Sequence, residues 1–136
     1  MNSIMAIGEY QGELRTEVKH VRSGQTIITD APIDNLGKGQ AFSPTDLVCA
    51  ALSSCMMTIM GQVADREGVN LKGLKTGIVK VMDNNPRKIA EIIITFSHPN
   101  LIATNPQKQK LINAARTCPV ALSLDSELKQ TVIFNF

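Results

Sequence analysis

Runs of one charge are missing from this sequence. The 14 lysine and arginine residues and the 12 aspartate and glutamate residues are scattered along 136 positions, with no basic stripe. A protein that binds a phosphate backbone clusters its basic residues, because release of counterions drives the association. We therefore expect no nucleic-acid partner.

Metal-binding patterns are also missing. The chain has 3 cysteines without a CxxC pair and 2 histidines, His20 and His98. A structural zinc site needs four such ligands at short, recognisable spacings. We expect no metal and no bound cofactor.

No secretory signal is expected, because residues 1–12 lack a basic segment followed by a long apolar one. A reducing cytoplasm is then the expected location, where cysteines are free or catalytic more often than structural. The length suits one domain that covers residues 1–136.

The longest uncharged segment, residues 47–64, approaches the length that spans a bilayer. No aromatic belt flanks it, and five small or polar residues interrupt it: Ser53, Ser54, Thr58, Gly61 and Gln62. These features predict a buried helix and no membrane association. A helix that is apolar nearly all round needs cover on nearly all sides, and a homodimer would provide it.

The remaining pattern predicts an α+β fold. Alternating side chains predict strands, with turns between them, at residues 4–7, 13–21, 25–29, 76–82, 89–97 and 130–136. Helices are expected from Ser43 to Gly68, then over 105–117 and 119–124. Because strands and helices do not alternate regularly, the sheet is expected to be largely antiparallel.

The start of the long helix carries strong local signals. Ser43 suits the N-cap, Pro44 the first helical position, and Asp46 the third residue of a capping-box arrangement. Residues 30–40 predict an exposed irregular loop that could form the wall of a site, because the segment contains Pro32, Asp34, Asn35, Gly37 and Gly39.

Two cysteines far apart in sequence stand out as candidate reactive thiols. Cys55 lies about three turns into the long helix, beyond the reach of the helix dipole, so a nearby cation would have to stabilise its thiolate. Cys118 precedes Pro119 at a predicted helix start, where free amides would lower its pKa. If the fold brings the two together, one thiol would attack a substrate and the other would resolve the product, and the local chemistry leaves open which one attacks. Cys49 lies about 240° around the helix from Cys55, which favours a place in the core.

Candidate cations for these thiols are Arg15, Arg22 and Arg116. Asp46 lies about 13.5 Å of helix rise and half a rotation from Cys55, so it could act only through a bridging arginine or across a dimer.

The motifs Phe42-Ser43-Pro44-Thr45-Asp46-Leu47-Val48-Cys49-Ala50-Ala51-Leu52-Ser53-Ser54-Cys55 and Cys118-Pro119-Val120 resemble those of the OsmC/Ohr family of thiol peroxidases. The order of predicted elements is similar to that family's over nearly the whole chain. The resemblance implies an OsmC-like, intertwined α+β homodimer with the long helix at its centre.

The same resemblance implies roles for four residues. Cys55 would be the peroxidatic cysteine of a hydroperoxide reductase, Cys118 the resolving cysteine, and Arg15 and Asp46 the groups that activate the thiolate. A dithiol such as a lipoyl group would reduce the resulting disulfide. Thr45 stands where many hydroperoxide-specific members carry a glutamate.

Two other functions remain open. Sulfur transfer through Cys118-Pro119 is disfavoured, because Ala121 occupies the place of a second proline found in small sulfur carriers. The non-enzymatic alternative is a dimeric ligand-binding or stress-response module on the same fold.

Overall fold

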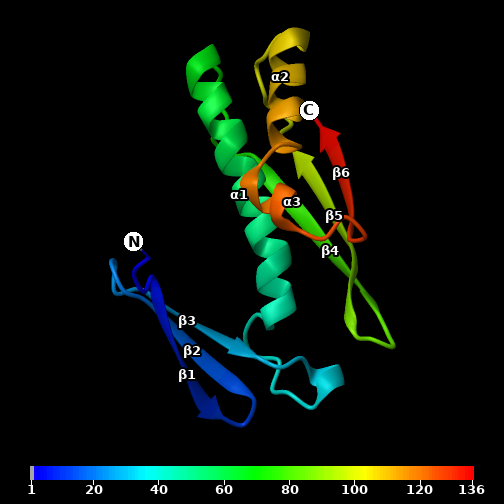
Figure 1. Ribbon diagram of the computed structural model, residues 1–136. Coiled ribbons are helices and arrows are strands. Elements are labelled where there is room, and N and C mark those ends of the chain that lie inside the picture. Colours follow the sequence, from blue (N-terminus) through cyan, green and yellow to red (C-terminus); the bar gives the residue numbers. More distant parts are fainter. Residues whose placement is uncertain (1) are drawn as a thin grey trace. The chain divides into compact units, whose positions relative to one another are not determined.

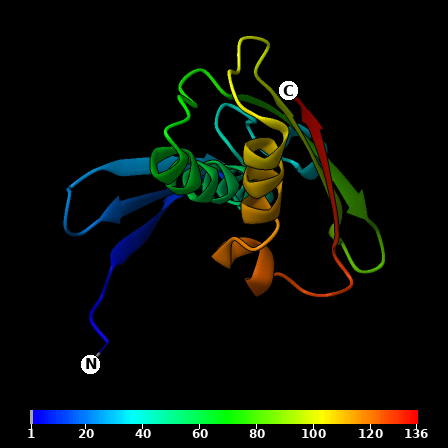
Figure 2. The same cartoon turned by 90° about the horizontal axis from the view of Figure 1, so that it is seen from above.

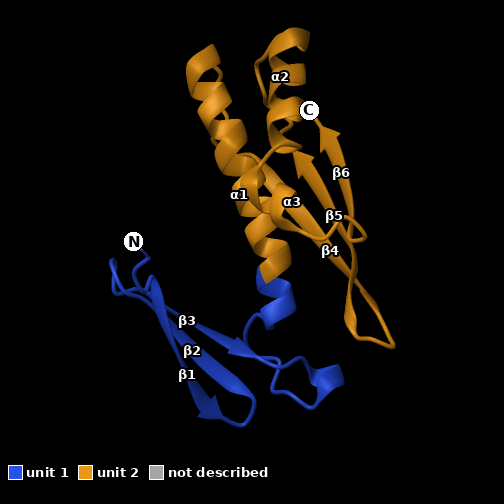
Figure 3. Cartoon of the chain, viewed as in Figure 1, with its two compact units in different colours: residues 1–47 blue, residues 48–136 orange. Residues whose placement is uncertain are grey.

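The structure is a computed structural model that describes residues 2–136 (Figure 1). The chain divides into two compact units, residues 1–47 and residues 48–136, and each is described here by itself (Figure 3). Both units contain a three-stranded sheet. The expected α+β class is confirmed, whereas a single domain over residues 1–136 stays a prediction.

The N-terminal unit is an antiparallel meander of β1 (Ala6–Gly12), β2 (Arg15–His20) and β3 (Thr26–Asp30). The predicted hairpin over β2 and β3 is present, and the first strand lies later and runs longer than the predicted 4–7. A tight turn at residues 12–14, all with positive φ, joins β1 to β2. The loop after β3 was expected to be irregular, but it contains one short 3-10 helix, η1 (Ile33–Asn35).

Helix α1 (Pro44–Glu67) begins with the predicted capping box. The Asp46 amide donates to Ser43 Oγ at 3.1 Å, and the Ser43 amide donates to Asp46 Oδ2 at 3.0 Å. Gly68 follows the helix with a φ of 70°, a backbone conformation that glycine adopts without strain.

One stripe of α1 is buried, and its members recur every three or four residues: Cys49, Leu52, Ser53, Met56, Met60 and Ala64. Length and composition alone would allow α1 to cross a membrane. This is weak evidence, because the core helix of a soluble protein passes the same test.

The C-terminal unit packs α1 and α2 (Asn105–Ala115) beside the sheet of β4 (Lys75–Asp83), β5 (Lys88–Ser97) and β6 (Lys129–Asn135) (Figure 2). Thr104 caps α2, and the Gln107 side chain donates to the Glu67 carbonyl at 3.2 Å, which ties α2 to the end of α1. Helix α3 (Pro119–Ser123) follows directly.

The sheet of this unit departs from the antiparallel expectation at its last strand. β4 and β5 form an antiparallel hairpin, but β6 runs parallel to β5. The reason is the connection: α2 and α3 carry the chain back to the starting end of β5, and such crossovers join parallel strands.

The core lies between this sheet and the helices. Ile92, Ile94 and Phe96 alternate inward along β5 and meet the buried stripe of α1 together with Leu111 and Ala115 of α2. The Phe96 ring stacks on Phe134 of β6, with 5.5 Å between the ring centroids. This packing fixes α1 and the α2–α3 junction, which carry the two candidate cysteines.

Candidate functional site

Cys55 and Cys118 come together inside the C-terminal unit. Cys55 lies midway along α1, and Cys118 is the N-cap of α3. Both are free thiols, and the Cys55 side chain lies close enough to Cys118 to affect its ionisation. A short connection places Cys118 there, since α2 ends at Ala115 and Pro119 starts α3.

Burial raises the pKa of the Cys118 thiol above its ordinary value of 9.0, and the neighbouring Cys55 raises the pKa further. The Cys118 side chain is 0% exposed. The amides of α3 oppose this effect, as expected for a helix start: the Ala121 amide donates to Cys118 Sγ at 3.3 Å. The expectation of a net lowered pKa is therefore wrong, because burial outweighs the amides. Cys118 is a protonated thiol at neutral pH.

Of the three cysteines, Cys55 alone is not fully buried. Cys55 is half-buried, so it is the member of the pair that a solute can reach. Cys49 is 2% exposed and packs in the main hydrophobic core, which fits its assignment as a core residue.

A groove of about 540 Å³ runs between α1 and α2 close to the cysteines. Its wall includes Ile59, one helical turn beyond Cys55, and Thr117, the residue before Cys118. The other lining residues are apolar near the middle and charged at the far end: Val63, Arg66, Glu67, Lys110, Asn113 and Ala114. Lys110 pairs with Glu67 at 3.1 Å.

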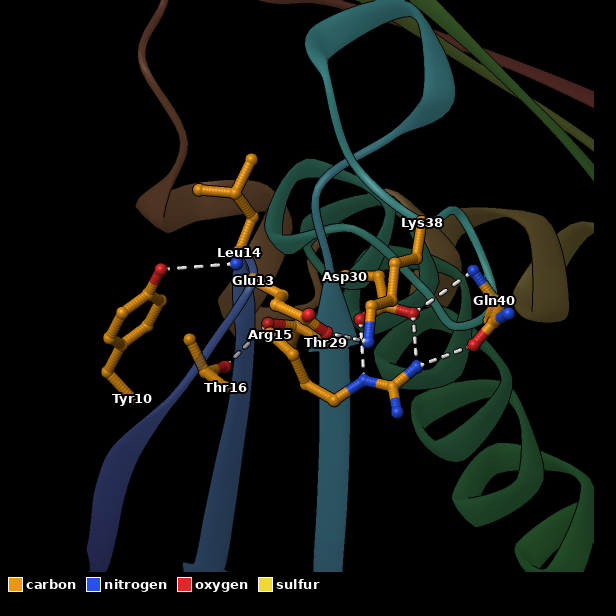
Figure 4. Close-up of polar contacts among 9 residues, drawn as sticks. All are labelled: Tyr10, Glu13, Leu14, Arg15, Thr16, Thr29, Asp30, Lys38 and Gln40. Carbon is orange, nitrogen blue, oxygen red and sulfur yellow. Dashed lines mark hydrogen bonds and ion pairs between the residues drawn. The ribbon is translucent and has the colours of Figure 1, made fainter.

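Arg15 forms a separate polar cluster within the N-terminal unit (Figure 4). Its Nε donates to Asp30 Oδ1 at 2.7 Å and its Nη2 to Asp30 Oδ2 at 2.8 Å, a bidentate pair. Nη2 also donates to Gln40 Oε1 at 3.0 Å, and the Gln40 amide donates to Asp30 Oδ2 at 3.1 Å.

The Arg15–Asp30 hydrogen bonds shift both ionisations. They hold the pKa of the buried Asp30 carboxyl below its ordinary value and raise the pKa of Arg15. Both groups are therefore charged at neutral pH. Asp30 and Gln40 were not identified from the sequence. The feature that would have identified Asp30 is the pairing of β2 with β3, because this register places Arg15 opposite Asp30.

The other sequence-derived candidates lie as follows. Asp46 forms the capping box with Ser43 in the N-terminal unit. Arg116 places its guanidinium 5.8 Å from the centre of the Phe134 ring, and Arg22 is exposed. The action of Arg15 and Asp46 on Cys55 stays a prediction. Among residues 2–136, no three His, Cys, Asp or Glu side chains gather as a metal site.

Fold and site together define an α+β protein with two adjacent free thiols, one accessible on a long helix and one buried at the start of a short helix. The model of the OsmC-like protein family matches residues 37–132. The chain belongs to this family, as the resemblance of its cysteine motifs implied.

Solved structures agree with that assignment. A protein of Psychrobacter arcticus 273-4, assigned to the osmotic stress and detoxification response, is 40% identical, with a TM-score of 0.95 over 99% of this chain and 98% of the other. The organic hydroperoxide resistance protein OsmC of Legionella pneumophila shares the fold at 15% identity, with a TM-score of 0.75 over 100% of both chains. An OsmC-like protein of Vibrio cholerae, VCA0330, shares it at 19% identity and a TM-score of 0.76, over 98% of this chain and 100% of that one. No curated relative matches the sequence.

Proposed function

We propose that this protein is a cysteine-based reductase of hydroperoxides, with Cys55 as the attacking thiol and Cys118 as the resolving thiol. The observation that carries the proposal is the contact between the two free thiols. Membership of the OsmC-like family and the fold shared with hydroperoxide resistance proteins support it.

Exposure and protonation suggest which thiol does what. The attacking sulfur must meet a peroxide from solution, and Cys55 is the accessible member of the pair. The resolving sulfur needs only to reach its neighbour, which the buried Cys118 can do, and its raised pKa makes Cys118 the weaker candidate for the first attack. The proposal keeps Arg15 and Asp46 as the groups that activate the Cys55 thiolate.

The reaction would proceed in three balanced steps. The Cys55 thiolate attacks one oxygen of the peroxide, the O–O bond breaks, and the alcohol leaves with a proton while Cys55 becomes a sulfenic acid. Cys118 sulfur then attacks the Cys55 sulfur, which expels water and forms a disulfide. A dithiol such as a lipoyl group then reduces that disulfide by thiol–disulfide exchange. The dithiol becomes oxidised, and both cysteines return to thiols.

The protein would act without a cofactor, in a reducing cytoplasm, as a homodimer. The homodimer is supported by the uneven cover of α1, whose buried stripe leaves Met57 only half-buried and Ala51 exposed within one chain.

Peroxide consumption by three matched variants tests the roles. Cys55→Ser should abolish consumption of cumene hydroperoxide in the presence of dihydrolipoamide. Cys118→Ser should allow one turnover and stop at a sulfenic acid that dimedone traps. Cys49→Ala is the control and should keep wild-type consumption. Unchanged consumption by Cys55→Ser would reject the mechanism.

A ligand-binding module is the second candidate, and two observations favour it. Thr45 occupies the place of the glutamate common in hydroperoxide-specific relatives, and a groove with a partly apolar wall lies beside the thiols. This candidate predicts that the purified protein retains an apolar molecule that native mass spectrometry detects. It also predicts that Cys55 reacts with peroxide no faster than a free thiol.

A further inference from the structure

A second concave site lies in the C-terminal unit, away from the thiols. This cleft has a volume of about 760 Å³, within the range of small-molecule sites, and is lined by the segment after α1 and by the end of β5 with the loop that follows. Neither Cys55 nor Cys118 lines it. Its residue at the end of α1, Gly68, lies roughly 20 Å of helix rise beyond Cys55.

The charge of the cleft is of one sign. Lys72 and Lys75 line it, and no carboxylate residue does. Both lysines are exposed. The cleft therefore favours an anion over a neutral or cationic molecule.

His98 adds a buried group without a partner. Its side chain lines the cleft, yet the residue is only 9% exposed. Nε2 lies 2.9 Å from the Lys72 carbonyl oxygen, which can only accept, so Nε2 carries the proton. Nδ1 is buried and has no hydrogen-bond partner among the described residues. Buried polar atoms are nearly always paired, so an orphaned ring nitrogen at the wall of a cleft points to a ligand that completes it.

Asn70 supplies a further donor. The Lys72 amide donates to Asn70 Oδ1 at 3.1 Å, which leaves the Asn70 amide group, with its two N–H donors, for another acceptor. The cleft thus combines two ammonium groups, an amide donor and an imidazole whose unprotonated Nδ1 can accept a hydrogen bond. Pro99 and Ile102 provide apolar wall beside these donors.

We propose that this cleft binds a small molecule through a phosphate group. A phosphate carries up to two negative charges and several acceptor oxygens, which match the lysines and Asn70 better than a singly charged carboxylate does. Its singly protonated form also carries a hydroxyl that can donate to Nδ1 of His98, which an ionised carboxylate lacks. The lysines supply the charge, a protonated phosphate oxygen donates to Nδ1 of His98, and the apolar wall receives any organic part. The site is independent of the peroxidase proposal.

Titration of the ¹⁵N-labelled protein with inorganic phosphate and with phenyl phosphate, at constant ionic strength, tests this site. We expect saturable shifts of amide signals in residues 68–75 and 97–102, together with a change in the His98 ring nitrogen signals. Tighter binding of phenyl phosphate would assign an organic monoester as ligand, and equal binding would assign free phosphate. Either result supports the site.

Charge variants provide the controls. Lys72→Gln and Lys75→Gln should each weaken phosphate binding by about fivefold, because each removes one nearby charge at the protein surface. Lys19→Gln, an equal loss of charge on an exposed strand of the N-terminal unit, should leave binding unchanged. Shifts that do not saturate, shifts outside the cleft, or equal weakening by Lys19→Gln would overturn the proposal.

Discussion

The protonation state of Cys118 sets the rate at which the disulfide should form. The pKa of Cys118 lies above 9.0, so at pH 7 fewer than about 1 in 100 of these thiols are ionised. Thiolate is the attacking species in exchange at sulfur. The resolving step should therefore accelerate about tenfold for each pH unit between pH 7 and pH 9.

This expectation holds after Cys55 has reacted. The Cys55 thiol raises the pKa of Cys118, and that contribution disappears when Cys55 becomes a neutral sulfenic acid. Burial, the largest cause of the raised pKa, remains. The Ala121 amide, 3.3 Å from Sγ, lowers the pKa by less than burial raises it.

The assay separates the two steps. One equivalent of cumene hydroperoxide forms the sulfenic acid, the sample is then jumped to the test pH, and dimedone competes with Cys118 for it. The ratio of disulfide to dimedone adduct reports the rate of the resolving step. Cys118→Ser is the control and should give the adduct alone. A resolving rate that stays constant from pH 7 to pH 8.5 would refute a protonated, buried Cys118.

Other groups give independent predictions. The raised pKa of Cys118 contributes stability below pH 9.0 that is lost as the pH rises through the folded-state pKa. The midpoint of urea unfolding should therefore fall at alkaline pH, and it should fall less in Cys118→Ala. The lowered pKa of Asp30 contributes stability above about pH 3.8 that is lost as the pH falls through its folded-state pKa; acid unfolding followed by circular dichroism should show less of this loss in Asp30→Asn. Phe96→Ala should cost about 3–5 kcal/mol in urea unfolding, because the ring is fully buried, and a loss below 1 kcal/mol would contradict the core packing. Ser43→Ala should cost about 1 kcal/mol in the same assay through loss of its bond to the Asp46 amide, whereas a neutral result would show that the cap is dispensable.

Local patterns predicted the elements of the fold well. Ser43, Pro44 and Asp46 marked the start of α1, and Gly68 marked its end, because caps and glycine stops act within one turn of chain. The hairpins were predicted from the alternation of side chains along their strands. The parallel pairing of β6 with β5 was not predicted, because it depends on how α2 and α3 return the chain and not on the sequence of β6 itself.

The candidate site was only partly accessible from sequence. The cysteine motifs identified Cys55 and Cys118, but only the packing of the C-terminal unit brings them into contact and buries one of them. The pKa of Cys118 could not be derived from its place at a helix start, since burial depends on distant residues. Asp30 and Gln40, which hold Arg15, required the strand register and the loop conformation.

The contact between the two thiols is the central claim, and one mass measurement tests it most directly. The fully reduced protein is exposed briefly to one equivalent of an organic hydroperoxide, and its intact mass and peptide map are recorded. We predict rapid, stoichiometric loss of two hydrogens with a disulfide that joins Cys55 to Cys118. An unchanged mass over minutes would contradict the account and favour the ligand-binding module.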